Sequence, residues 1–152
     1  MDRKMRFVLL VPFVLALPLS LVACADSVSA PERTQGLVAP AAQGPHTLVE
    51  LKGSGKFISA QITKQGGASD LTFVSLDIDG KNVVNASIAA LRNWALTQSN
   101  PYGIVVLQSA AGLKTVTIGY PSTLKFEKSL KLSVTVQEPN VAQIIGNVVH
   151  GK

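Results

Sequence analysis

The stretch Leu130-Lys131-Leu132-Ser133-Val134-Thr135-Val136-Gln137 alternates apolar and polar side chains without a break. Successive side chains of a β-strand point to opposite faces, so this period of two predicts a strand with one buried face and one wet face. The same alternation recurs over residues 114–120, 58–62 and 74–78. We therefore expect antiparallel β-sheet to dominate from residue 46 onward.

Short turn signals separate these alternating stretches. Asp79-Gly80 is a two-residue hairpin signal, because both residue types accept the positive φ of a type I′ turn. Further breaks at Gly, Pro and Asn follow about every ten residues, a spacing typical of a β-sandwich or barrel. We predict an all-β fold, an antiparallel β-sandwich or barrel of about eight strands. The expected strands cover 46–52, 55–63, 71–79, 81–85, 103–109, 113–120, 123–127, 129–137 and 141–149.

One stretch, 87–98, departs from the period of two. Ile88 and Leu91 are spaced as on one face of a helix, Ser87 is a suitable N-cap, and Pro101 stops the helix. We predict a short helix near 87–98 that plugs one end or edge of the sandwich. Trp94 and Tyr102 are interpreted as packing and turn residues rather than ligand contacts.

A basic and then apolar leader precedes the domain. Arg3, Lys4 and Arg6 are charged, whereas residues 7–23 carry no charge. This layout is typical of a signal peptide. A membrane-spanning helix needs about 20 apolar residues, whereas this run has 17 (7 to 23) and contains two prolines. We therefore interpret residues 1–23 as a signal peptide.

Leu21-Val22-Ala23-Cys24 resembles the lipobox of bacterial lipoproteins, and Cys24 is the only cysteine of the chain. The resemblance implies cleavage before Cys24, two acyl chains of the palmitate type on that residue, and usually a third. It also implies the outer membrane rather than the inner membrane of a two-membrane host, since Ala25 rather than Asp follows the cysteine. The alternative is ordinary secretion, in which cleavage after Ala25 discards Cys24.

Residues 24–45 are rich in small and polar side chains and contain three prolines. This composition is typical of a linker. We expect a lipidated N-terminus and a flexible tether over 24–45, with a span of about 25 Å as a random coil. The β-sandwich domain is then expected over 46–152.

Composition excludes several classes of function. With 47% hydrophobic residues the chain can bury a core, and one cysteine excludes an internal disulfide or a Cys-based zinc site. The net charge is +5, of which the leader carries two units, and the remaining lysines are scattered rather than clustered as nucleic-acid binding requires. We expect no nucleic-acid partner, no metal and no cofactor.

Signals for catalysis are missing from the sequence. His46 and His150 have no G-x-S-x-G elbow or other nucleophile context. Asp77-Ile78-Asp79-Gly80 resembles a calcium loop only faintly, because the later acidic ligand and the flanking helices are missing. We interpret that segment as a hairpin turn and do not expect an enzyme.

A candidate ligand site combines Phe57 and Gln61 of strand 55–63 with Phe73 and Asp77 of strand 71–79. If the two strands pair as neighbours, each phenylalanine lies near one of the polar side chains on a common face. Two aromatic rings, an amide and a carboxylate would suit a flat ligand such as a sugar ring. The alternative is that both phenylalanines are core residues, covered by Trp94 and the helix.

These features together predict a membrane-anchored envelope lipoprotein that acts as a non-catalytic binding module for a protein or glycan partner. One alternative is a structural envelope component that self-assembles through a strand edge. Another is a carrier that holds a small lipophilic ligand inside the barrel.

Overall fold

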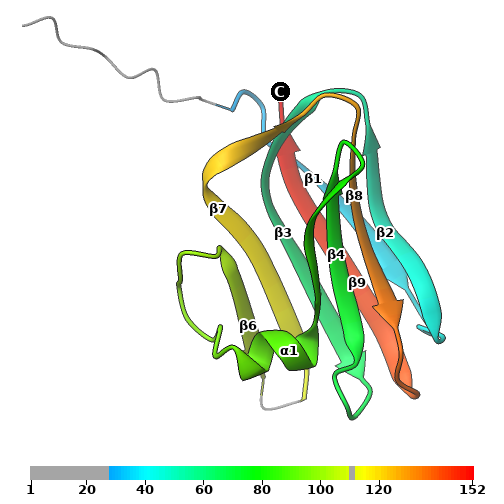
Figure 1. Ribbon diagram of the computed structural model, residues 1–152. Coiled ribbons are helices and arrows are strands. Elements are labelled where there is room, and N and C mark those ends of the chain that lie inside the picture. Colours follow the sequence, from blue (N-terminus) through cyan, green and yellow to red (C-terminus); the bar gives the residue numbers. More distant parts are fainter. Residues whose placement is uncertain (1–27, 110–111) are drawn as a thin grey trace, which may run out of the picture.

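Nine strands form two antiparallel sheets packed face to face (Figure 1) within residues 28–109 and 112–152, which the computed structural model describes. Sheet A contains, in spatial order, β1 (Glu32–Val38), β9 (Val141–Gly151), β3 (Gly55–Gly66), β7 (Lys114–Phe126) and β6 (Ile104–Gln108). Sheet B contains β2 (Gly44–Lys52), β8 (Ser129–Val136), β4 (Thr72–Ile78) and β5 (Lys81–Ser87). The predicted all-β sandwich is confirmed.

The alternating residues of β8 and β4 build one wall of the core. Leu130, Leu132 and Val134 of β8 are buried, and the polar residues between them are at least partly exposed. Apolar residues of β3, β7 and β9 line the opposite wall, among them Ile62 and Ile118. The period of two thus predicts correctly which face of each central strand is buried.

The predicted helix is present as α1 (Ile88–Asn93), which carries the chain from β5 in sheet B to β6 in sheet A at one end of the sandwich (Figure 1). Ser87 is the N-cap, and its hydroxyl accepts a hydrogen bond from the Ala90 N–H at 3.1 Å. Ile88 and Leu91 are fully buried. The helix is shorter than the predicted 87–98, because Ala95 adopts a left-handed conformation with φ of 54°.

The prediction of a tether over 24–45 is wrong from residue 32 onward, whereas the predicted signal peptide, Cys24 and residues 25–27 lie outside the described residues. Residues 32–38 form β1, which pairs with β9 from Glu32↔His150 to Val38↔Ile144. β1 is an edge strand whose inward-facing residues are Thr34, Gly36 and Val38. Because only one of these three is a large apolar residue, the sequence of β1 does not show the apolar alternation of a central strand. The folded domain therefore includes residues that composition alone assigns to a linker.

Two predicted strands, 113–120 and 123–127, are one strand in the structure. β7 runs through Pro121 because residues 120–123 have no partner on β3, where the register shifts between Phe57 and Ser59. A proline lacks the N–H that a paired strand residue donates, so it is tolerated at this irregular position.

A close contact between backbones joins the two sheets at one edge. Gly36 of β1 and Gly146 of β9 are register partners, and Leu48 of β2 lies over both. A Cβ atom on Gly36 would come within 1.7 Å of the Leu48 carbonyl oxygen, and one on Gly146 within 2.7 Å of Leu48 Cδ1. Leu48 and Val49 are both buried because β2 bulges between Thr47 and Val49.

We expect Gly36→Ala to destabilise the protein by about 1–3 kcal/mol or more, because the added methyl group overlaps the Leu48 backbone. Gly119→Ala is the matched control in the same sheet, since its Cβ would lie 3.8 Å from the nearest atom, on Ser59. Urea unfolding of both variants measures the difference. Equal stabilities would contradict the assigned contact.

Candidate functional site

The four residues of the predicted ligand site lie on two different sheets. Phe57 and Gln61 are in β3 of sheet A, whereas Phe73 and Asp77 are in β4 of sheet B. β3 pairs with β7 and β9, and β4 pairs with β5 and β8. The predicted pairing of these two strands is wrong, because the connection between them crosses from one sheet to the other instead of forming a hairpin.

Phe57 is a core residue with no exposed surface, as the alternative interpretation holds. The β3 irregularity at Ile58 shifts the alternation by one residue, so Phe57 shares the inner face with Ala60 and Ile62. Its ring packs at a tilt against Tyr120, with 6.4 Å between ring centroids. Trp94, which the same interpretation places over the phenylalanines, is 62% exposed.

The other three predicted site residues lie on outer surfaces. Gln61 is exposed on sheet A, and Phe73 is half-buried on the outer face of sheet B. Asp77 is half-buried and accepts a hydrogen bond from Asn82 Nδ2 at 2.9 Å. The structure therefore does not bring the four side chains together on one face.

The faint calcium-loop segment is the hairpin turn between β4 and β5, as predicted. Asp79 and Gly80 both have positive φ. The Asp79 carboxylate accepts hydrogen bonds from the N–H groups of Ser129, Glu127 and Lys128, and these bonds lower the pKa of Asp79. Among the described residues, no group of three His, Cys, Asp or Glu side chains is placed to hold a metal ion.

A hollow at the α1 side of the sandwich is the strongest candidate site. It has a volume of about 520 Å³ and is lined by Trp94, Leu96, Tyr102 and Ile104, and we call it the aromatic hollow. Trp94 is 62% and Tyr102 69% exposed, the highest values among the large hydrophobic residues that the structure describes. Aromatic rings normally bury most of their area, so two rings exposed at one place mark a contact surface.

Hydrogen bonds within the α1–β6 connection hold the Trp94 side of the hollow. The Trp94 N–H donates to the Ala90 carbonyl at 3.0 Å and closes the last turn of α1. The next residues are fixed by the bond from the Val106 N–H to the Leu96 carbonyl, at 2.7 Å. Leu96 is itself buried and lines the hollow together with Trp94.

Asn100 holds the Tyr102 side of the hollow. Its Oδ1 accepts from the Tyr102 N–H at 3.0 Å, and its Nδ2 donates to the Ile104 carbonyl at 2.7 Å. Gly103 completes the turn with φ of 68°, and a Cβ there would come within 2.4 Å of the Gly119 carbonyl oxygen. The two aromatic side chains are thus presented from a backbone that is already ordered.

The interpretation of Trp94 and Tyr102 as packing and turn residues is correct for the backbone of Tyr102 and wrong for both rings. Tyr102 does occupy a turn, but its ring and that of Trp94 are mostly exposed. The turn sequence Asn100-Pro101-Tyr102-Gly103 could have predicted the exposure of the Tyr102 ring, because a side chain in the middle of a turn projects from the surface. The exposure of Trp94 follows from the early end of α1, which helical periodicity does not reveal.

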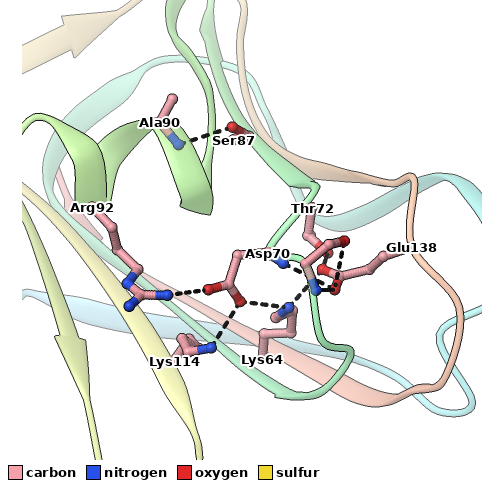
Figure 2. Close-up of polar contacts among 9 residues, drawn as sticks. Lys64, Asp70, Thr72, Ser87, Ala90, Arg92, Lys114 and Glu138 are labelled. Atoms are coloured by element: carbon pink, nitrogen blue, oxygen red, sulfur yellow. Dashed lines mark hydrogen bonds and ion pairs between the residues drawn. The ribbon is translucent and has the colours of Figure 1, made fainter.

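A second cluster of interest is a buried network of charges beside α1 (Figure 2). Lys64 Nζ lies 2.6 Å from Glu138 Oε1 and 3.0 Å from Asp70 Oδ1. Asp70 also binds Lys114 at 2.9 Å and Arg92 at 2.6 Å. Lys64, Asp70 and Glu138 are almost completely buried.

The carboxylates of this network are saturated by donors and stay ionised. Glu138 Oε1 accepts from the Thr72 hydroxyl at 2.8 Å, and its Oε2 accepts from the N–H groups of Ser69 and Asp70. Burial by itself raises the pKa of Asp70 and of Glu138, but the hydrogen bonds from Lys114, Lys64 and their other donors outweigh it and lower both pKa values. The network therefore holds its buried charges paired at this end of the sandwich.

We expect the protein to lose stability in acid. A carboxyl group whose pKa is lowered by folding stabilises the native state above its unfolded pKa, and this contribution is lost as the pH falls through the folded pKa. For Asp70 and Glu138 the loss begins below about pH 4–5. Urea unfolding as a function of pH measures it.

Glu138→Gln tests the source of this pH dependence. It should lower stability near neutral pH by up to about 3–5 kcal/mol, because the buried Lys64 then loses its closer carboxylate and keeps only Asp70 as a charged partner. It should also flatten the decline in acid. Glu50→Gln, on the exposed side of β2, is the control for removing one negative charge. A decline of unchanged steepness in Glu138→Gln would contradict the assignment.

Within the described residues, no helix is long and apolar enough to cross a membrane. A comparison with protein-family models and a comparison with curated protein sequences give no match to this chain.

Proposed function

We propose that this protein is a lipid-anchored, non-catalytic module of the bacterial envelope that binds a sugar ring of an envelope glycan in the aromatic hollow. The observation that carries the proposal is the joint exposure of Trp94 and Tyr102 around one hollow. The anchoring part rests on the leader and on the lipobox-like sequence that ends at Cys24.

The chemistry of the hollow suits a sugar better than a charged ligand. Its lining consists of two aromatic rings and the side chains of Leu96 and Ile104, which offer apolar contact to the C–H face of a ring. Thr97, Gln98 and Ser99, which lie between Leu96 and Tyr102 in the sequence, are exposed and carry hydrogen-bonding side chains. The volume of about 520 Å³ lies within the range of small-ligand sites.

A protein partner is less well supported by the distribution of exposed apolar side chains. Stable protein interfaces bury at least about 1,000 Å². Leu37 lies on β1, which is the opposite edge of sheet A from β6, while Val83 lies on β5 of sheet B. Leu107 of β6 and Leu71 beside β4 are exposed as well, but Leu107 alternates with a buried valine and so points to the opposite face of sheet A from the core. Among the described residues, the exposed apolar side chains are therefore distributed over both sheets rather than gathered around the aromatic hollow.

Assembly through the β6 edge is also disfavoured. The Val106 N–H, on the outer side of β6, already donates to the Leu96 carbonyl, and the Ile104 carbonyl accepts from Asn100. An added strand would have to displace both bonds.

Trp94→Ala and Tyr102→Ala should each weaken retention on insoluble peptidoglycan about 5- to 10-fold, because each removes a stacking surface worth about 1 kcal/mol or more. Both residues are exposed, so the thermal midpoint should change little. Leu37→Ala, also exposed but on β1, is the matched control. Unchanged retention would refute glycan binding here, and loss of a co-purified protein instead would point to a protein partner.

The anchoring is tested by mass spectrometry of the mature protein isolated from its host. We expect an N-terminus at Cys24 that carries two or three acyl chains, and accumulation of the uncleaved precursor in Cys24→Ala. An unmodified N-terminus beyond Cys24 would show instead that the protein is secreted without an anchor.

A further inference from the structure

The first described residues and the C-terminal residues lie side by side at one end of the sandwich (Figure 1). Ser29 and Lys152 are joined by two backbone hydrogen bonds, from the Ser29 N–H at 3.3 Å and from the Lys152 N–H at 3.4 Å. Cys24 precedes Val28 by four residues, and four residues span at most about 14 Å even when fully extended. An acyl group on Cys24 is therefore confined to the neighbourhood of this end.

Lysines are concentrated at the same end. Three turns meet there, since the Gly53 N–H donates to the Lys128 carbonyl at 2.8 Å and the Asp79 N–H to the Ser129 carbonyl at 2.9 Å. We call this surface the lysine end, and its lysines are Lys52, Lys56, Lys81, Lys125, Lys128 and Lys152. All of them are exposed except Lys56, which is half-buried.

Acidic residues at the lysine end are fewer, and one of them is already engaged. They are Glu32, Glu50, Asp79 and Glu127, two fewer than the lysines. The Asp79 carboxylate is directed at three backbone N–H groups of the β7–β8 turn. At the opposite end Lys64 and Lys114 are buried against Asp70, and the half-exposed Arg92 is paired with the same carboxylate, so the exposed lysines of the described domain lie mainly at the lysine end.

We infer that the lysine end is a membrane-apposed surface that contacts anionic lipid headgroups, an inference that rests on the lipid anchoring proposed above. β9 has 11 residues, so the sandwich is about 36 Å long in the direction of this strand. The link from Cys24 to Val28 reaches at most about 14 Å, which is too short to carry a domain of this size clear of the bilayer. Lysines attract anionic lipid only within about one Debye length of the surface, roughly 8 Å at physiological salt. A link of at most about 14 Å lets the lysine end reach that range, and the attraction of the lysines to anionic headgroups then keeps it there.

This orientation turns the aromatic hollow away from the lipid. Ile104 pairs with Ile118, which precedes Phe126 at the lysine end by eight residues (118 to 126). Eight strand residues correspond to up to about 26 Å. The hollow would thus face the space beyond the membrane surface.

The test uses the acylated mature protein in vesicles of phosphatidylcholine with or without phosphatidylglycerol. Cys24 is the only natural cysteine, and acylation blocks its thiol, so Ser54→Cys or Gln98→Cys accepts a single thiol-reactive fluorophore. Ser54 is exposed in the β2–β3 turn of the lysine end, and Gln98 is exposed beside the aromatic hollow. We expect headgroup-attached quenchers to quench the probe at residue 54 strongly and the probe at residue 98 weakly. Equal or reversed quenching would overturn the orientation.

Variants that remove positive charge test the headgroup contact itself. Each lysine at the surface strengthens attraction to anionic lipid about five-fold, so Lys52→Gln with Lys128→Gln and Lys152→Gln should lower quenching at residue 54 on phosphatidylglycerol-containing vesicles only. The same three lysines changed to arginine, which keeps each positive charge, are the matched control and should leave the quenching at residue 54 unchanged. Quenching unchanged by the triple substitution would refute the lysine contact.

Mass spectrometry of the same preparations separates the two levels of failure. A protein that carries acyl chains at Cys24 but shows no preferred orientation refutes this inference and leaves the anchor in place. A protein without acyl chains refutes the anchor and, with it, the orientation.

Discussion

The ion pairs of Lys64 determine how one end of the sandwich is closed. Lys64 lies on β3, yet its ammonium group binds Glu138 from the β8–β9 connection and Asp70 from the β3–β4 connection. Asp70 in turn binds Arg92 of α1 and Lys114 of β7. Buried charges are tolerated only when they are paired and hydrogen-bonded. The five segments that carry these residues, β3, β7, α1 and the two connections, therefore have to be in place together for the buried charges to be paired.

The position of α1, and with it the aromatic hollow, depends on this network. The Ala89 N–H donates to the Asp70 carbonyl at 3.0 Å, and the Arg92 guanidinium donates to the Asp70 carboxylate at 2.6 Å. Trp94 follows two residues later and closes α1. The position of an exposed surface feature thus depends on a charge network that is largely buried.

The sequence predicts the parts of the fold that depend on local rules. Alternation identifies β8 and β4, Asp79-Gly80 gives the hairpin, and Ser87 gives the helix cap. It misses the parts that depend on distant partners. Residues 32–38 become a strand because β9 offers them a free edge, and Phe57 is buried because one irregular residue inverts the alternation of β3. Likewise, no local rule brings Lys64 and Glu138 together, since 74 positions separate them.

The saturated amide of Asn100 has an energetic consequence for recognition. With both Oδ1 and Nδ2 engaged by backbone groups, the connection that carries Tyr102 is ordered before any ligand arrives. Little conformational entropy then remains to be lost on association, and more of the apolar contact energy appears as affinity. Burial of two preorganised rings should give a negative heat-capacity change without a large rearrangement of the backbone.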